Sequence, residues 1–346
     1  MKRVLAGKAK AGSVKSKRSA GLPPDAKALG AAIAERSITL VLGAGVSKPR
    51  GVPDWRGLTR LLWENLLGAK TVPAWLSDGG AAPHPLADQM AIELLRTGCR
   101  DEPRFVRELR AALYGAATRP PDPGDTLAVL ARVLVAEQAA ERRRILRVIT
   151  FNADDHLETE VNRGHNPRRD PVLWPIARES GHPRMSRGAH GKAPIPVYHV
   201  HGFLPRDGAA RRWRDAPDTL VFTDAEYWAT AASPLTFANR VMAQALHDSS
   251  CIFVGVSMTD VNLIRWLGVR YNAIRDDIAA QGIYSDSEAR ARMRDALLRH
   301  FWIRRDESDP SGLISKLLLA RGVRSVSLAG WGAPFQKLML GSFDLR

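Results

Sequence analysis

The feature that most constrains the fold is a series of short apolar runs, each followed at once by glycine or by polar residues. The clearest run, residues 37–42, is rich in apolar and β-branched side chains and ends at Gly43. A strand that is apolar on both faces is typical of a parallel sheet covered by helices on both sides. Similar runs lie at 144–150, 172–176, 195–200, 219–222, 250–254 and 322–328.

Segments with helical spacing separate these runs, and 259–275 and 287–300 are two of them. Strands that alternate with helices predict an α/β fold, a Rossmann-like parallel sheet with helices on both faces. Residues 85–144 form a longer helical stretch, broken by Pro103 and a Pro/Gly-rich loop, and predict a helical insertion. The sequence therefore predicts one domain over 23–346, preceded by a tail over 1–22.

The charge of the chain is concentrated near its N-terminus. The net charge is +15, and the first 20 residues hold seven Lys and Arg and no acidic residue. Without those seven, 44 of the 51 basic residues remain against 36 acidic ones, a net charge of +8. Two interpretations of this disordered basic tail stay open: a contact to nucleic acid or an acidic partner, and a solvated leader.

Other features exclude several classes of protein. Cys99 and Cys251 are the only cysteines and neither lies in a C-x-x-C pair, which excludes a four-thiolate zinc module and argues against a disulfide framework. No apolar run approaches the roughly 18 residues that cross a bilayer. No apolar stretch follows the basic N-terminus as in a secretory signal, so we expect a cytoplasmic protein without membrane contact.

Polar motifs follow four of the predicted strands, at 43–47, 152–154, 201–202 and 255–257. Because the carboxyl ends of parallel strands meet at one edge of the sheet, we expect these motifs to lie close together. Ligands of open α/β folds bind at that edge. The coincidence of four motifs constrains the function more than any one of them.

The first motif, Gly43-Ala44-Gly45, would let the backbone turn tightly and approach a pyrophosphate, although Lys48 stands where a third glycine is usual. A simple strand-to-helix turn remains the alternative. In the next loop, Arg56 could pair with a phosphate, and Trp55 could either cover a ligand ring or pack on the core.

Asn152 and Asp154 follow a strand directly, where an amide can hold a water or a ribose hydroxyl without taking a charge. The alternative is a turn that caps the next helix. His199 and His201 are two apart and would share a face if the strand continued. We find no third ligand and predict no metal site. His201 is instead the candidate general base, and His199 is expected to be structural.

Taken together, the motifs resemble the NAD-binding core of sirtuins over about residues 35–330. The segments that carry the resemblance are GAGVS at 43–47, GVPDWR at 51–56, TFNAD at 150–154, VHG at 200–202 and GVS at 255–257. They occur in the order and at roughly the spacing of that family.

One branch is more similar than the rest. YHVHG at 198–202, FTDAEY at 222–227 and FVGVSMTDVN at 253–262 resemble the sirtuin-like NAD hydrolases of bacterial anti-phage defence. Members of that group act in Thoeris systems, beside HerA-type ATPases or with short Argonautes. The chain departs from deacylating sirtuins because it lacks both C-x-x-C pairs, carries the helical stretch and has Trp55 where Phe is usual.

The resemblance implies cleavage of NAD+ to nicotinamide and ADP-ribose, with NAD as substrate. Asn152 would position water or a ribose hydroxyl and His201 would be the base. Asp154 would hold the nicotinamide amide, and Arg56 would meet the phosphates. The other residues implied in NAD binding are Gly43, Ala44, Gly45, Ser47, Asp54, Trp55, Gly255, Ser257 and Asp260.

Three alternatives stay open: an NAD-dependent protein deacylase, a sensor that binds NAD or ADP-ribose without turnover, and a nucleic-acid-binding subunit that uses the basic tail. An NAD-depleting enzyme must be silent until it is triggered. Since we see no room for a separate sensing domain, we expect control by a homo-oligomer, with 85–144 as its surface, or by a partner such as a HerA-type ATPase or a short Argonaute.

Overall fold

The structure is a computed structural model of the 346-residue chain. It describes residues 24–77, 82–84, 87–115, 122–165, 170–178, 191–206, 219–258, 260–281 and 286–345. The predicted basic tail, residues 1–22, lies outside the described residues.

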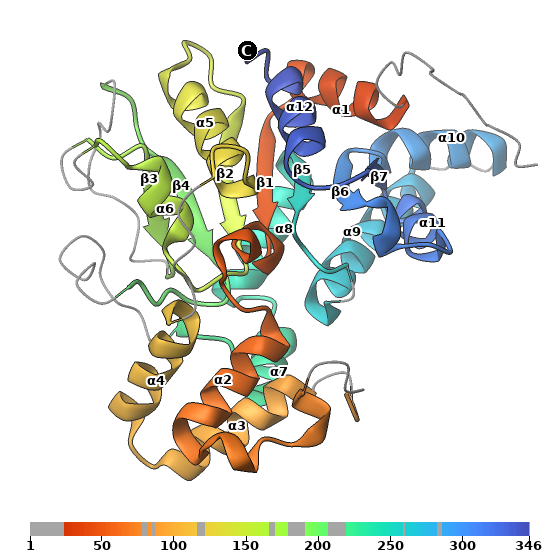
Figure 1. Cartoon of the computed structure of the whole chain (residues 1–346). Helices are drawn as coiled ribbons and strands as arrows, with labels where there is room; N and C mark the ends of the chain where they lie inside the picture. Colours follow the sequence, from red (N-terminus) through yellow and green to blue (C-terminus); the bar gives the residue numbers. More distant parts are fainter. Residues whose placement is uncertain are drawn as a thin grey trace, which may run out of the picture.

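A parallel sheet of seven strands forms the centre of the described structure, in the order β3-β4-β2-β1-β5-β6-β7 (Figure 1). All six neighbouring pairs run parallel. The predicted α/β fold with a Rossmann-like parallel sheet is confirmed. The strands are β1 (Ile38–Leu42), β2 (Ile145–Thr150), β3 (Leu173–Ile176), β4 (Ile195–His199), β5 (Ser250–Val254), β6 (His300–Arg305) and β7 (Val323–Leu328).

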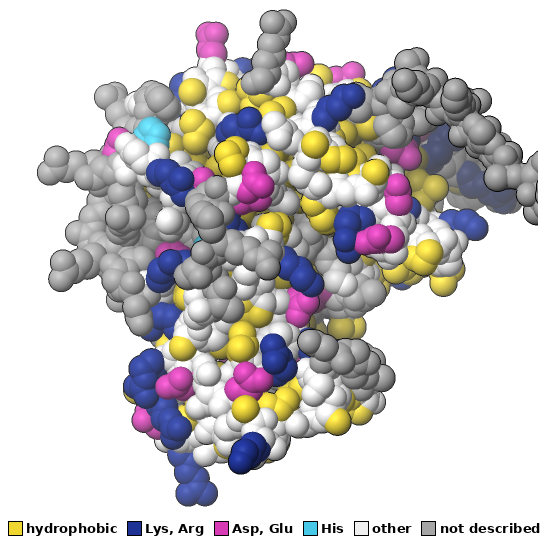
Figure 2. Space-filling view, in the orientation of Figure 1, with side chains coloured by type: hydrophobic (Ala, Val, Ile, Leu, Met, Phe, Trp, Pro, Cys, Tyr) yellow, Lys and Arg dark blue, Asp and Glu magenta, His cyan; other side chains and the backbone are white. Residues whose placement is uncertain are grey.

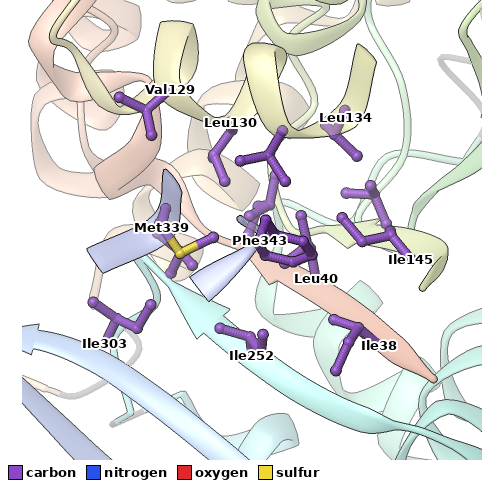
Figure 3. Close-up of a cluster of buried hydrophobic side chains, with 14 of the residues drawn as sticks. Ile38, Leu40, Val129, Leu130, Leu134, Ile145, Ile252, Ile303, Met339 and Phe343 are labelled. Carbon is purple, nitrogen blue, oxygen red and sulfur yellow. The ribbon is translucent and has the colours of Figure 1, made fainter. Parts of the chain in front are cut away.

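One face of the sheet packs against α1 (Pro24–Glu35), α5 (Thr126–Ala139), α6 (His156–Val161) and α12 (Ala333–Ser342). Figure 3 shows the centre of this layer, where Ile38 and Leu40 of β1 lie beneath Leu130 and Leu134 of α5 and beside Phe343. All five residues of β1 are buried, as expected for a strand with neighbours on both sides and helices on both faces.

The opposite face packs against α8 (Phe237–Asp248), α9 (Val261–Ala280) and α11 (Leu313–Ala320). Val41 and Phe253 point to this side, whereas Leu40 and Ile252 point to the other, as the two-residue period of a strand requires. Helix α10 (Asp286–Leu297) packs against α9.

A third layer of helices lies below the carboxyl ends of the strands (Figure 1). It consists of α2 (Trp55–Leu67), α3 (Ala87–Cys99) and α4 (Glu102–Tyr114), which we call the helical lobe. The lobe has its own apolar cluster, which extends to Ala153 and Leu204 in the loops after β2 and β4. α7 (Asp224–Ala232) lies beside α3. The predicted helical stretch 85–144 is thus divided, since α3 and α4 belong to the lobe and α5 to the sheet.

Two local predictions were wrong. Residues 219–222 form no strand, although the amide of Val221 donates to the carbonyl of His201, just after β4, at 3.1 Å. The helix predicted over 287–300 is too long, because α10 ends at Leu297 and a strand, β6, begins at His300. The side chain of His300 is fully buried and its Nδ1 accepts the Cys251 amide at 3.0 Å, so a polar residue occupies a core strand position.

Short 3-10 helices complete the described elements: η1 (Ala44–Val46), η2 (Lys48–Arg50), η3 (Ala69–Thr71), η4 (Ala74–Leu76) and η9 (Asp306–Ser308). Over the described ranges, no helix is both long enough and apolar enough to span a bilayer. On the face shown in Figure 2, basic side chains are interspersed with acidic and apolar ones rather than gathered in one large patch.

Candidate active site

A cavity of about 740 Å³ lies between the carboxyl edge of the sheet and the helical lobe. It opens beside β1, which lies between β2 and β5 in the sheet. The chain enters β2 from α5 on one face of the sheet and enters β5 from α8 on the opposite face. This is the topological switch point at which open α/β sheets bind ligands. Of the thirteen site residues predicted from the sequence, all except Ser47 line the cavity.

The glycines after β1 allow two loops to pack backbone against backbone. A Cβ atom at Gly43 would lie 2.6 Å from the carbonyl oxygen of Gly255, and one at Gly45 would lie 2.7 Å from the Gly255 Cα. The amides of Gly43 and Gly45 already donate to the carbonyls of Val254 and Gly255, at 3.1 and 3.0 Å. Two of the N–H groups expected to face a phosphate are therefore bonded to the loop after β5.

The loop between β1 and α2 is held by an ion pair and a helix cap, both made by Asp54. Asp54 caps the N-terminus of α2 by accepting the Gly57 amide at 3.0 Å, and Lys48 pairs with the same carboxylate at 2.9 Å. Partial burial raises the pKa of Asp54, but the bonds from Lys48 and Gly57 outweigh it and leave the pKa lowered. The carboxylate of Asp54, rather than a ligand phosphate, thus occupies the first turn of α2.

Trp55 packs on aromatic neighbours while it lines the cavity. Its ring lies 5.1 Å from that of Phe222 and 6.3 Å from that of Tyr227. Both sequence interpretations of Trp55, packing and ligand contact, are therefore compatible with its position. Arg56 lines the same wall, within electrostatic range of Asp54 and Asp88.

Arg50, which the sequence analysis missed, fixes the far end of this loop. Its guanidinium pairs with Asp125 at 2.6 Å and with Glu160 at 2.9 Å, and all three side chains are nearly buried. Asp125 also caps α5 by accepting the Ala128 amide at 2.7 Å. The loop after β1 is thereby bound to α5 and α6.

The side chain of Asn152 points toward the loop after β1. Its Nδ2 donates to the carbonyl of Gly43 and to Oγ of Ser47, both at 3.3 Å. Ser47 is buried and also contacts Oδ1 of Asp154 at 3.5 Å, so it lies behind the cavity wall and links the two polar residues. These two bonds from Nδ2 hold the amide in one orientation at the cavity wall.

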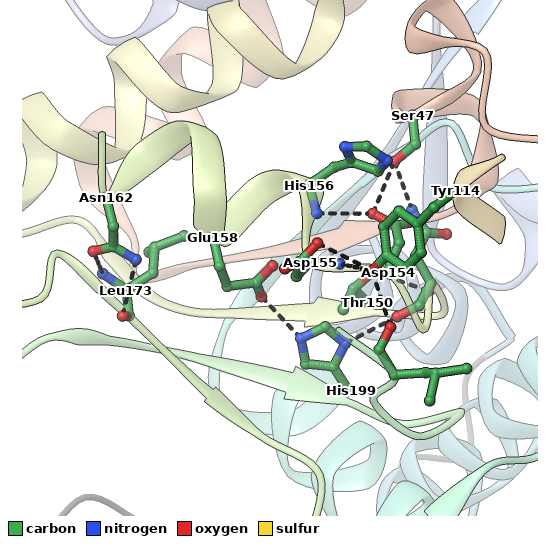
Figure 4. Close-up of polar contacts among 12 residues, drawn as sticks. Ser47, Tyr114, Thr150, Asp154, Asp155, His156, Glu158, Asn162, Leu173 and His199 are labelled. Atoms are coloured by element: carbon green, nitrogen blue, oxygen red, sulfur yellow. Dashed lines mark hydrogen bonds and ion pairs between the residues drawn. The ribbon is translucent and has the colours of Figure 1, made fainter. Parts of the chain in front are cut away.

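His199 and His201 lie in separate environments because β4 ends at His199. His199 is buried and bonded at both ring nitrogens: Nδ1 to the carbonyl of Asn152 at 2.9 Å and Nε2 to Glu158 at 2.8 Å. Figure 4 shows the Glu158 contact under α6. After the strand, Gly202 takes a positive φ of 87°, which turns the chain and places His201 on the cavity.

His201 is buried, and neither of its ring nitrogens has a hydrogen-bond partner among the described residues. The ring lies 4.9 Å from that of Phe151 and 5.3 Å from that of Tyr227. Burial lowers the pKa of His201, and the carboxylate of Asp260 offsets this in part. Burial thus favours the neutral imidazole, which is the form that a general base requires.

Asp154 belongs to a buried polar network at the start of α6 (Figure 4). Its Oδ1 accepts the His156 amide at 3.1 Å, and burial is the main cause that raises its pKa. The neighbouring Asp155 is held by Tyr114 of α4, whose hydroxyl lies 3.0 Å from Oδ1 and accepts the Asp155 amide at 3.0 Å. The helical lobe is thus bonded directly to the loop that carries Asn152.

The cavity residues that were not predicted include Asp88 and Gln89 of α3 and Tyr227 of α7. The only available signal was the FTDAEY segment, which contains Tyr227. Asp260, which was predicted, caps α9 by accepting the Leu263 amide at 2.9 Å and accepts the Tyr227 hydroxyl at 3.4 Å. Within the described part of the chain, no three His, Cys, Asp or Glu side chains are grouped as metal ligands would be.

The fold and the cavity define an α/β protein with its ligand site at the switch point of a parallel sheet. Comparison with protein families identifies a SIR2-like domain over residues 146–308, from β2 to η9. This range contains Asn152, His201 and the loop after β5, and it excludes β1 and its glycines. A search of curated proteins found no match to the chain.

Proposed function

We propose that the chain is an NAD+ hydrolase that cleaves the N-glycosidic bond to nicotinamide. The observation that supports this most directly is the pairing, on one cavity, of a fixed amide at Asn152 with a buried imidazole at His201 whose ring nitrogens have no hydrogen-bond partner among the described residues. The SIR2-like match over the same segment makes NAD the expected ligand.

The reaction consumes one water: the bond between the ribose C1′ and the pyridinium nitrogen breaks, and the bond electrons leave with nicotinamide. Because the leaving group is a cation that becomes neutral, it needs no proton. The transition state has oxocarbenium character, so the site must orient the ribose and a water rather than supply a strong acid.

Asn152 orients the water or a ribose hydroxyl with its amide, which the bonds to Gly43 and Ser47 hold in one orientation. His201 accepts the proton that the attacking water loses as it becomes the anomeric hydroxyl of ADP-ribose. General-base help of this kind contributes about 10²–10⁴-fold in rate. Phe151, Trp55 and Tyr227 enclose this part of the cavity and limit access of other water.

Arg56 is the candidate contact for the pyrophosphate. The loops at 43–45 and 255–257, which pack backbone against backbone because Gly43, Gly45 and Gly255 have no side chains, are assigned to the wall that holds the dinucleotide. Asp154 is assigned to the nicotinamide amide. Its raised pKa is consistent with a carboxyl group that can share a proton with a neutral amide.

The proposal includes a role as an anti-phage effector that depletes NAD, controlled by self-association or by a partner protein. The resemblance of the strand-end motifs to defence hydrolases supports it. Size-exclusion chromatography with light scattering, before and after mixing with a candidate partner, measures the assembly directly.

The test of the enzymatic proposal is chromatography of NAD+ incubated with the full chain and with Asn152→Ala and His201→Ala. Matched controls are Asn272→Ala and His247→Ala, which remove the same side chains at exposed positions of α9 and α8. Nicotinamide and ADP-ribose should form with the wild type and both controls, and not with the two cavity variants. If none of the proteins turns NAD+ over, calorimetry decides: binding without turnover indicates a missing activator or a sensor, and no binding contradicts the proposal.

A further inference from the structure

The start of α3 brings two polar side chains from the helical lobe to the cavity. Asp88 and Gln89 both line it, facing the sheet-borne residues across the ligand space. They lie outside the segment that matches the SIR2-like domain. Their contribution to the cavity therefore comes from the helical lobe and not from the matched segment.

The orientation of Gln89 follows from its neighbour. Gln89 is 9% exposed and its side chain bonds to the Tyr227 hydroxyl. That hydroxyl has one hydrogen, which it donates to Oδ2 of Asp260 at 3.4 Å, so its oxygen accepts from Nε2 of Gln89. The other amide atom, Oε1, is buried at the cavity wall and has no partner among the described residues.

Asp88, the residue before Gln89 on α3, provides a second acceptor in the cavity lining. Its Oδ1 is buried without a hydrogen-bond partner in the described structure. Burial raises the pKa of Asp88, the nearby Asp54 adds to this, and Arg56 opposes it. A buried amide oxygen and a buried carboxylate oxygen from one cavity wall favour a ligand group with N–H donors, because a buried acceptor left unpaired is costly.

Given the proposed NAD binding, on which this inference rests, we propose that Asp88 and Gln89 select a dinucleotide by a primary amide or amino group. A carboxylate or an oxo group at the same place supplies no donor pair and, for the carboxylate, adds repulsion from Asp88. NAD+ has two such groups, the nicotinamide carboxamide and the adenine amino group. The two analogues that replace them one at a time are nicotinic acid adenine dinucleotide and nicotinamide hypoxanthine dinucleotide.

The experiment is calorimetric titration of the full-length Asn152→Ala protein, which removes turnover, with NAD+ and with each analogue. The same titrations are run on this protein with Asp88→Asn, with Gln89→Leu and with the control Glu93→Gln. Glu93→Gln makes the same charge change on α3, at a position that does not line the cavity. Asp88→Asn is isosteric, so it tests the charge without opening a void.

We expect one analogue to bind at least about tenfold more weakly than NAD+, since sites built to bond an N–H reject ligands that lack it. Asp88→Asn and Gln89→Leu should remove most of that difference, and Glu93→Gln should leave it intact. The analogue that loses affinity identifies the end of the dinucleotide at α3. If NAD+ binds but neither analogue is disfavoured, or if the preference survives both α3 variants, the inference is wrong while the proposed function stands. If neither this protein nor the wild type binds any of the dinucleotides, both fail.

Discussion

Nε2 of His199 lies 2.8 Å from Oε1 of Glu158, and both side chains are 1% exposed. On its other side, Nδ1 of His199 contacts the carbonyl oxygen of Asn152 at 2.9 Å. Since a carbonyl oxygen only accepts, Nδ1 carries a hydrogen, and the contact between Nε2 and Glu158 shares one further proton. Glu158, His199 and the Asn152 backbone thus form a relay of contacts from α6 to the cavity.

This relay predicts that Glu158 and His199 are positioning residues for Asn152. Glu158→Ala should lower kcat of NAD+ cleavage by about 10²-fold with little change in KM, because a displaced catalytic group loses that much when it shifts by about 1 Å. Steady-state kinetics on the full chain measure both constants.

The conservative variant separates positioning from simple destabilisation. Glu158→Gln keeps the shape, and its amide N–H can donate to Nε2 while Nδ1 still donates to Asn152, so most of kcat should return. Equal losses of kcat in Glu158→Gln and Glu158→Ala, at similar melting temperatures, would contradict the relay.

Histidine burial predicts a loss of stability in acid. The pKa of His300 is held well below its ordinary value by burial, with Arg270, Arg299 and Arg36 adding to the effect. A histidine that is neutral when folded and titrates near pH 6.5 when unfolded binds more protons in the unfolded state. Stability is therefore full above about pH 6.5 and falls as the pH drops below it, by up to about 1.4 kcal/mol per pH unit for each such group.

Urea unfolding at a series of pH values measures this slope. His300→Asn should reduce it, because an amide oxygen can still accept the Cys251 amide without titrating. His247→Asn, on the exposed side of α8, is the control and should leave the slope unchanged. The lowered pKa of His201 adds to the same slope and also predicts that NAD+ cleavage declines in acid at a pH below the ordinary histidine value.

The sequence predicted the sheet well where burial makes a strand apolar throughout. β1 and β5 are such strands, and every one of their residues is buried. β6 was missed because it begins with a histidine and ends with two arginines, and its pattern continued that of α10. His300 fits the core only because the Cys251 amide bonds it, a long-range contact that no local pattern encodes.

The candidate site was predictable to the extent that it lies at strand ends. Asn152, His201 and Gly255 follow strands directly, and the parallel topology brings them to one edge. Asp88, Gln89 and Arg50 could not be found this way, because each depends on how the helical lobe or a loop packs against the sheet. The separate surroundings of His199 and His201 depend likewise on where β4 ends.

Arg50 predicts a large stability effect at a distance from the cavity wall. Arg50→Ala should destabilise the fold by about 3–5 kcal/mol, since it leaves Asp125 and Glu160 nearly buried without their shared cation. Lys48→Ala removes an ion pair that is more than half exposed and should cost about 1 kcal/mol or less. Chemical denaturation of the two variants gives the comparison, and similar small losses would mean that the Arg50 cluster is not a stabilising anchor.

Gly45 predicts that the contact between the loops after β1 and β5 tolerates no side chain. The nearest atoms to an added Cβ are backbone atoms of Gly255, at 2.7 and 2.9 Å, which cannot rotate away as a side chain would. Gly45→Ala should therefore separate the loops and weaken binding of NAD+ in calorimetry, as well as lower the melting temperature.

Gly30→Ala in α1 is the matched control, because nothing lies within 4 Å of its added Cβ. That substitution should leave binding unchanged and stabilise the helix by up to about 1 kcal/mol. Unchanged binding in Gly45→Ala would mean that this loop contact does not shape the ligand site.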